Sequence, residues 1–366
     1  MKNSQNGMEY KLVSDIEAFN LDSFSPRLTL QQDNMIQLYK DMLIIRYVEE
    51  YLEQQYKKSN IRGFCHLTIG QEGLYAVLKD IIDHDCLITS YRCHGAAYAA
   101  GVNLKEIICE NLGTGEGNCR GKGGSMHLYG DRFFGGHGIV GAQVPLGAGV
   151  AFALKYMAMN KTVTNEDNDF VAKSKESFLN AKTDNVCFCI FGDGATNQGQ
   201  VYETYNMAKV YNLPIVFIVE NNRYGMYTPL ENVTVDDCFF KRGYGIPGIR
   251  VRDTKISNLK GVLEFSKGYS MKCGPIIVQV DTFRKCGHST LDLSKYYITK
   301  DVSEREAGLD CLLNLENELK GKVPEQELKS IKEDAYLTVT QCANEIDFEN
   351  VPGEQELYSD IFFKNE

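Results

Sequence analysis

Apolar residues recur along this chain with two different spacings, and the two kinds of segment alternate. In the first part of the chain the spacing is three or four positions, which predicts a helix that ends before Arg62. The apolar face of that helix is made by Met35, Leu38, Met42, Ile45, Val48 and Leu52. A second helix with the same spacing is predicted to begin at residues 70–72.

Short, continuous apolar runs predict buried strands between the helices. These runs occupy residues 86–90, 186–191, 214–219 and 276–280. A helix over residues 198–211 is predicted between the second and the third of them. This alternation of strand and helix predicts an α/β fold, with a doubly wound, mostly parallel sheet flanked by helices. Residues 302–346 predict a helical C-terminal segment.

Glycine and polar residues divide the chain into three parts. Residues 1–28 are expected to form an irregular N-terminal arm, residues 29–300 the main domain, and residues 301–366 the helical C-terminal segment and tail. Within the main domain, glycine-rich residues 113–149 predict a long shaped loop that leads into a helix over 147–160. Residues 161–185 are charged and have no regular period, which is typical of a surface insertion.

Composition excludes several classes of protein. The 366 residues are 43% hydrophobic and carry a formal net charge of -10, which argues against a nucleic-acid partner. No apolar run approaches the roughly 20 residues that span a bilayer, so no membrane insertion is expected. The 12 cysteines include no CxxC pair and indicate reduced thiols. The first 20 residues show neither an Arg-rich amphipathic face nor a signal-peptide core, so no transit peptide is visible.

Polar side chains follow two neighbouring predicted strands at the point where each strand ends. Asp193 lies in a Gly-Asp-Gly turn after the strand over 186–191, and Asn222 follows the strand over 214–219. A helix-length segment separates them, so both should lie at the carboxyl ends of adjacent parallel strands. The glycines allow a sharp turn and a close approach of the backbone to a ligand.

This arrangement favours a site for a diphosphate and a divalent cation. A carboxylate beside a diphosphate requires a cation between them, and Mg²⁺ prefers oxygen ligands. The predicted ligands are the Asp193 carboxylate, the Asn222 amide oxygen and the backbone carbonyl of Tyr224. The following helix N-terminus, with Gly194 and Ala195, would bind the phosphate end of the cofactor. The alternative is a strand-end turn with an N-cap aspartate, but the paired asparagines after the next strand favour the cation site.

Several motifs in order resemble one family. They are IRGFCH at 61–66, SYR at 90–92, GKGGSMH at 121–127, GIVGAQVPLG at 138–147, GDG at 192–194, ETYNM at 203–207 and ENNRYGM at 220–226. Together they resemble the alpha subunits of the pyruvate dehydrogenase decarboxylase component, within the thiamine diphosphate-dependent 2-oxo acid dehydrogenases. The resemblance covers roughly residues 29–300, with a weaker echo at 356–360. It implies the thiamine diphosphate-binding fold.

The resemblance assigns further site residues. It implies that Tyr91 and Arg92 contact the cofactor and that Arg92 pairs with the diphosphate. Gly138 and Val140 would lie against the aminopyrimidine end of the cofactor. His66 and His288 would act at the active-site entrance. His94 is the third histidine considered for such a role, and a lone histidine is more often structural.

The same resemblance implies an activity and its partners. The cofactors would be thiamine diphosphate and Mg²⁺, and the reaction would be the oxidative decarboxylation of pyruvate with acetyl transfer to a lipoyl domain, for acetyl-CoA formation. A beta subunit would supply the carboxylate that activates the aminopyrimidine, so the enzyme would be an alpha2-beta2 heterotetramer, active only with both subunits. The implied location is the mitochondrial matrix or a related organelle, and the alternative is the cytoplasm.

Other functions stay open at this stage. The nearest is the alpha subunit of a branched-chain 2-oxo acid or acetoin dehydrogenase, and a more distant one is a subunit without catalytic activity. A nicotinamide dehydrogenase is weakly suggested by GHGIVG at 136–141, but no apolar strand is predicted before it. Two features bear on regulation: Ser289 aligns with a phosphorylated serine of the family, and Cys286 stands where relatives often have a histidine.

Overall fold

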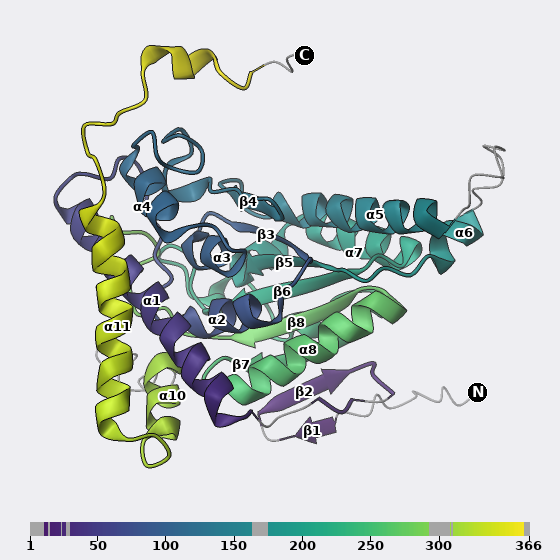
Figure 1. Ribbon diagram of the computed structural model, residues 1–366. Helices are drawn as coiled ribbons and strands as arrows, with labels where there is room; N and C mark the ends of the chain where they lie inside the picture. The colour runs from purple at the N-terminus through teal and green to yellow at the C-terminus, as the bar shows by residue number, and fades with distance from the viewer. Residues whose placement is uncertain are drawn as a thin grey trace, which may run out of the picture.

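An eight-stranded sheet forms the centre of the structure (Figure 1). The computed structural model describes residues 11–13, 15–22, 24–26, 30–162, 175–292, 308 and 310–361. The strand order is β1-β2-β7-β8-β6-β5-β3-β4. The strands are β1 Lys11–Val13, β2 Ile16–Phe19, β3 Cys86–Ser90, β4 Phe133–His137, β5 Cys187–Gly192, β6 Ile215–Asn221, β7 Gly248–Arg252 and β8 Ile276–Asp281. All neighbours from β7 to β4 pair in parallel, whereas β2 pairs antiparallel with both β1 and β7.

Helices cover both faces of the sheet, as the sequence predicts for an α/β fold. One face is covered by α5 Gln143–Thr162, α6 Lys175–Asn180 and α7 Gly199–Tyr211. The helices on the other side are α1 Gln32–Lys57, α2 Glu72–Ile81, α3 His94–Ala99, α4 Leu104–Leu112, α8 Ile256–Cys273, α10 Cys311–Leu319 and α11 Glu325–Asn344. In Figure 1, α11 runs alongside α1, which seats the predicted helical C-terminal segment on the core.

The central strands are apolar throughout because both of their faces are covered. In β6, Val216 and Ile218 point into the core beneath α2 and α8, and Phe217 points into the core beneath α5 and α7. All three side chains are fully buried. Continuous apolar runs therefore identify these strands better than an alternating pattern would.

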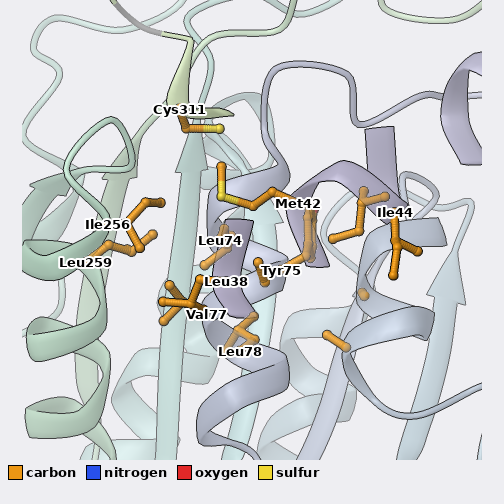
Figure 2. Close-up of a cluster of buried hydrophobic side chains, with 14 of the residues drawn as sticks. Leu38, Met42, Ile44, Leu74, Tyr75, Val77, Leu78, Ile256, Leu259 and Cys311 are labelled. Carbon is orange, nitrogen blue, oxygen red and sulfur yellow. The ribbon is translucent and has the colours of Figure 1, made fainter. Parts of the chain in front are cut away.

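The helical side of the core joins elements that are distant in sequence. Figure 2 shows Leu38 and Met42 of α1 close to Leu74 of α2, with Ile256 of α8 and Cys311 of α10 beside them. The fit is tight around Gly73, where an added Cβ would lie 2.9 Å from Ile256 Cδ1 and 3.3 Å from Cys311 Cβ. The start of α10 is thus fixed against α2 and α8.

Three local expectations are wrong, each because tertiary contacts decide the structure. The described part of the N-terminal arm is not wholly irregular: β1 and β2 extend the sheet edge next to β7, where pairing compensates for short strands. The 113–149 segment contains β4, and α5 begins at Gln143 rather than at 147. The glycines of β4 conceal it in the sequence, yet Gly136 is needed there, since a Cβ would lie 2.7 Å from Cys93 Sγ.

The 161–185 segment is not wholly without structure. Residues 163–174 lie outside the described residues, but α6 follows them. Phe178 of α6 is 9% exposed and packs against Phe152 of α5, with ring centroids 4.7 Å apart. Part of the predicted surface insertion therefore belongs to the packed body.

Among the described residues, no helix combines the length and the apolar character needed to cross a bilayer.

Candidate active site

The carboxyl ends of β5 and β6 bring the predicted cation ligands to one edge of the sheet. The two strands are adjacent and parallel, with Gly192 opposite Glu220. Asp193 opens a short 3₁₀ turn directly after β5, and Asn222 directly follows β6. Both side chains are buried, with exposures of 4% and 8%. The strand-end geometry expected from the sequence is present.

A guanidinium that the sequence analysis missed already touches two of the three predicted ligand oxygens. Arg284 Nη1 donates to Asn222 Oδ1 at 3.1 Å and to the Tyr224 carbonyl oxygen at 3.3 Å. Arg284 follows the end of β8, which is the other neighbour of β6. The strand predicted over 276–280 could have indicated Arg284 as a site residue, because the ends of all three parallel strands meet at this edge.

Asp193 supplies the carboxylate of the predicted cation site, and Arg284 holds the other two ligand oxygens. Burial raises the pKa of Asp193 to about 6, although Arg284 and backbone N–H groups favour the charged form. A divalent ion would favour that form further. The donor set consists of a carboxylate, an amide oxygen and a carbonyl, all hard oxygen ligands of the kind that Mg²⁺ takes. The residues present therefore fit such an ion.

The glycines of the Gly-Asp-Gly turn leave room for a ligand. An added Cβ at Gly192 or Gly194 would meet no described atom within 4 Å. The protein's own packing therefore does not explain the small residues. Open space above a strand end, followed by the N–H groups of a turn, is where a phosphate group can approach the backbone.

Three aromatic side chains gather next to this edge. The rings of His66 and Tyr91 have centroids 4.3 Å apart, and those of His66 and His288 are 5.5 Å apart. Tyr91 Oη and His288 Nε2 lie 3.2 Å apart, within hydrogen-bonding distance. The structure thus places the two predicted catalytic histidines beside each other, on loops that are distant in sequence.

Both histidines are held neutral. Burial, then the nearby Arg92 and His288, lowers the pKa of His66 to about 2. Burial with Arg92 and Arg284 lowers the pKa of His288 to about 3. His66 Nδ1 is buried and has no hydrogen-bond partner in the part of the chain that the structure describes. These rings can hold hydrogen bonds at fixed positions, but they carry little charge at neutral pH.

Arg92 connects the two loops. Its Nη1 donates to the Leu67 carbonyl at 2.5 Å, and its Nη2 donates to the His288 carbonyl at 2.9 Å. The side chain is 4% exposed. In this structure Arg92 therefore joins the segment that carries His66 to the segment that carries His288.

Gly138 and Val140 lie on a surface loop near the start of α7. Val140 is 41% exposed, and Ile139 between them is 74% exposed. The loop adjoins α7 because an added Cβ at Gly141 would lie 3.1 Å from Gln200 Nε2. The residues expected to bind the aminopyrimidine end of the cofactor thus lie at an open surface of this chain.

Glu220 is a further buried acid that the sequence analysis named only as part of a motif. Burial raises its pKa to about 7, and Tyr75 Oη donates to its Oε2 at 3.1 Å. Its Oε1 is buried without a hydrogen-bond partner among the described residues. The sequence feature that could have identified Glu220 as a site residue is its position just before Asn221 and Asn222.

His94 has a structural position. Its Nδ1 lies 2.9 Å from Glu49 Oε2, and its Nε2 lies 3.1 Å from the Ser125 carbonyl oxygen. Nε2 also lies 2.9 Å from the Ser125 hydroxyl oxygen, so the ring bridges Glu49 and Ser125. Glu49 also accepts from the Thr68 N–H at 2.9 Å, which ties the His66 segment to α1.

The glycine pattern at 136–141 requires a correction. No strand is expected before it, but β4 runs into its first two residues, Gly136 and His137, and α5 follows it. The residues about twenty positions further along lie at the end of α5, where a dinucleotide site would instead place an acidic residue at a strand end. The pattern therefore belongs to the loop of Gly138 and Val140.

Comparison with known proteins identifies the family. Residues 40–352 match the family described as "Dehydrogenase E1 component". The chain is 40% identical over 291 residues to the mitochondrial pyruvate dehydrogenase E1 component subunit alpha of Saccharomyces cerevisiae, covering 79% of this chain and 63% of that protein. The Kluyveromyces lactis protein of the same name is 41% identical over 293 residues, covering 79% and 65%.

A mammalian relative matches over a greater length. The testis-specific mitochondrial form of the same subunit from Rattus norvegicus is 36% identical over 359 residues, covering 96% of this chain and 86% of that protein. Against the two yeast proteins, the match spans less than two thirds of the relative's length. The family match nonetheless extends over most of the chain and contains the whole site described above, so this chain belongs to the dehydrogenase E1 component family.

Proposed function

We propose that this chain is the alpha subunit of a pyruvate dehydrogenase. With a beta subunit it would catalyse the oxidative decarboxylation of pyruvate and acetyl transfer to a lipoyl group, in acetyl-CoA formation. One observation carries the proposal: in a member of this family, Asp193, Asn222 and Tyr224 present their oxygens at the carboxyl ends of β5 and β6. The relatives named above are pyruvate dehydrogenase subunits, which favours pyruvate over branched-chain substrates and acetoin.

The cofactors are thiamine diphosphate, on which the family depends, and Mg²⁺. When bound, thiamine diphosphate supplies the nucleophilic carbon and the electron sink that decarboxylation requires. Asp193, Asn222 and the Tyr224 carbonyl would hold the magnesium ion. Gly194 and Ala195 would present backbone N–H groups to the diphosphate, and Gly138 and Val140 would contact the other end of the cofactor.

His66, His288 and Tyr91 would orient the substrate. Their rings are in contact, and both imidazoles are neutral, so each can donate one hydrogen bond and accept another. Arg92 supports this arrangement by joining the two histidine loops, and its guanidinium supplies positive charge for an anionic group. A catalytically inactive subunit would not need to retain these side chains together.

The partner is a beta subunit, in an alpha2-beta2 assembly. The loop of Gly138 and Val140 is exposed in this chain, which suits a second chain that completes the site there and supplies the activating carboxylate. The lipoyl domain of an acetyltransferase component is the proposed acceptor. Since the relatives are named as mitochondrial, we propose the mitochondrial matrix or a related organelle as the location.

The decisive experiment is co-expression with a candidate beta chain. The purified assembly is assayed with pyruvate, thiamine diphosphate, Mg²⁺ and an artificial electron acceptor. We expect turnover from the assembly and none from this chain alone. Robust pyruvate decarboxylation by the isolated chain would refute the two-subunit assignment, and an assembly that prefers branched-chain substrates would refute the assignment of pyruvate.

Replacement of Asp193 tests the cation site. Asp193→Ala in the assembly should weaken Mg²⁺-dependent binding of thiamine diphosphate by on the order of 100-fold or more in calorimetry, with an unchanged circular dichroism spectrum. The matched control is Asp184→Ala, an exposed aspartate at the opposite end of β5. Equal affinities in the two variants would show that Asp193 does not hold the cation.

A further inference from the structure

The loop that carries His288, residues 284–292, is tied to the rest of the candidate site. The Lys285 N–H donates to the Ile69 carbonyl at 2.9 Å, and the Thr290 N–H donates to the Cys65 carbonyl at 2.9 Å. Together with the bond from Arg92 to the His288 carbonyl, these contacts join the loop to the His66 segment. They fix parts of the site to one another, and Cys286 of the loop packs against the helical core.

A second set of contacts connects this loop to the core. Lys285 Nζ lies 2.5 Å from Asp310 Oδ2, and Arg46 Nη2 lies 3.6 Å from Asp310 Oδ1. Arg46 Nε in turn lies 2.5 Å from Glu72 Oε1, which also accepts from the Gly70 N–H at 3.0 Å. We call Arg46, Glu72, Lys285 and Asp310 the clasp. It connects the His288 loop to α1, α2 and the start of α10.

The clasp is anchored at rigid points. Asp310 is the N-cap of α10, and its Oδ1 accepts from the Leu313 N–H at 3.2 Å. The next residue, Cys311, is fully buried beside Met42 and Leu74 (Figure 2). Glu72 lies in the first turn of α2, where a carboxylate also favours the helix dipole. Asp310, the partner of Lys285, is therefore held by the helical core and does not move with the loop.

The charges are well matched in the clasp. Burial opposes ionisation of Asp310, yet the hydrogen bond from Lys285 and the charge of Arg46 outweigh it and hold its pKa below the ordinary carboxyl value. The side chains of Asp310 and Glu72 are 9% and 0% exposed, while that of Lys285 is 41% exposed. Lys285 is therefore the accessible and separable end of an otherwise buried network.

We propose that the clasp is a positioning device that holds the 284–292 loop, and with it His288, against the helical core. Lys285 is a positioning residue rather than a catalytic one, because it acts through the loop and touches none of the predicted ligand residues. The inference rests on the proposed function only for its effect on turnover. The effect on the loop itself does not depend on that function.

Hydrogen exchange on the assembled alpha–beta protein, without cofactor, tests the device. Lys285→Gln removes the ion pair, and Asp310→Asn removes it while keeping a residue that caps helices well. We expect amide exchange in peptides over 284–292 to accelerate about fivefold in each variant, as for the loss of one ion pair of roughly 1 kcal/mol. Lys285→Arg should restore protection.

The matched control is Lys332→Gln, which breaks the Lys332–Glu316 ion pair between α10 and α11. It should leave exchange over 284–292 unchanged. In pyruvate assays, Lys285→Gln should raise KM or lower kcat about fivefold, with rescue by arginine. Unchanged exchange in both clasp variants, or equal acceleration in Lys332→Gln, would overturn the proposal. A different result separates the two proposals. If the clasp variants accelerate exchange but the unmutated assembly does not turn over pyruvate, the proposed function is refuted and the clasp proposal still holds.

Discussion

A single buried carboxylate organises the glycine-rich loop between α4 and β4. Glu110 is fully buried on α4 and accepts four backbone N–H groups. The donors are Cys119 at 2.7 Å, Gly121 at 2.9 Å, Gly123 at 2.6 Å and Gly124 at 3.2 Å. A phosphate would use N–H groups of this kind, but here the chain supplies its own anion. The loop is therefore a structural element of the fold.

Glu110→Gln should destabilise the protein. The amide has one oxygen in place of two, and its NH₂ group would face N–H donors, so at least two half-buried donors lose their partner. At about 1–3 kcal/mol for each unsatisfied group, the free energy of unfolding should fall by about 2–6 kcal/mol in urea titrations. Glu106→Gln, on the exposed side of the same helix, is the control. If both variants unfold at the same urea concentration, Glu110 does not hold the loop.

At the scale of elements, the hydrophobic pattern predicts the helices and strands whose own residues determine their structure. The strands over 86–90, 186–191, 214–219 and 276–280 were predictable because buried parallel strands are continuous apolar runs. The elements β2, β4 and α6 were not, because each is stabilised by distant parts of the chain, and β1 pairs, among the described strands, only with β2. Lys155 of α5 shows how: its Nζ donates to the carbonyls of Leu179, Tyr211 and Asn212 at 3.1, 3.2 and 2.7 Å. It thereby binds the C-terminal ends of α6 and α7.

Lys155→Met should loosen α6 selectively. Burial lowers the pKa of Lys155 to about 8, so at pH 7 the ammonium still supplies three donors for three carbonyls. Methionine keeps the volume but leaves these carbonyls unpaired, and we expect a loss of about 2–3 kcal/mol. Hydrogen exchange over 175–180 should accelerate more than exchange in β5. The exposed Lys209 of α7, changed to Met, is the control, and equal protection of α6 in both variants would contradict this role.

At the scale of the whole molecule, the sequence predicts where the site lies better than what holds it. Asp193 and Asn222 could be placed because parallel strands end at a common edge. Arg284, Glu49 and the clasp could not, because their partners are distant in sequence and no local pattern encodes such pairs. Glu49 of α1, for example, connects Thr68 of the His66 segment with His94 of α3, and His94 reaches Ser125 of the glycine-rich loop. The site therefore depends on buried ion pairs between elements.

This dependence predicts a specific acid sensitivity. Burial alone would raise the pKa of Glu49, but His94 and the hydrogen bonds from Thr68 outweigh it and lower that pKa from 4.5. The folded state thus holds the proton less tightly than the unfolded chain does. The resulting stabilisation is fully present above about pH 4.5 and is lost as the pH falls through the lower pKa of the folded state.

Glu49→Gln should therefore lower the free energy of unfolding at pH 7 by about 1–3 kcal/mol, because one amide oxygen cannot replace both carboxylate oxygens that meet Thr68 and His94. The gap between the unmutated protein and the variant should narrow as the pH falls below 4.5, since protonation of Glu49 removes the same charge. Urea unfolding at pH 7, 5 and 3.5 measures both effects. Glu53→Gln, one turn further along α1 and paired only with the exposed Lys57 among the described ion pairs, should stay within about 0.5 kcal/mol of the unmutated protein at pH 7. A gap for Glu49→Gln that stays constant across this pH range would mean that the charge of Glu49 does not stabilise the fold.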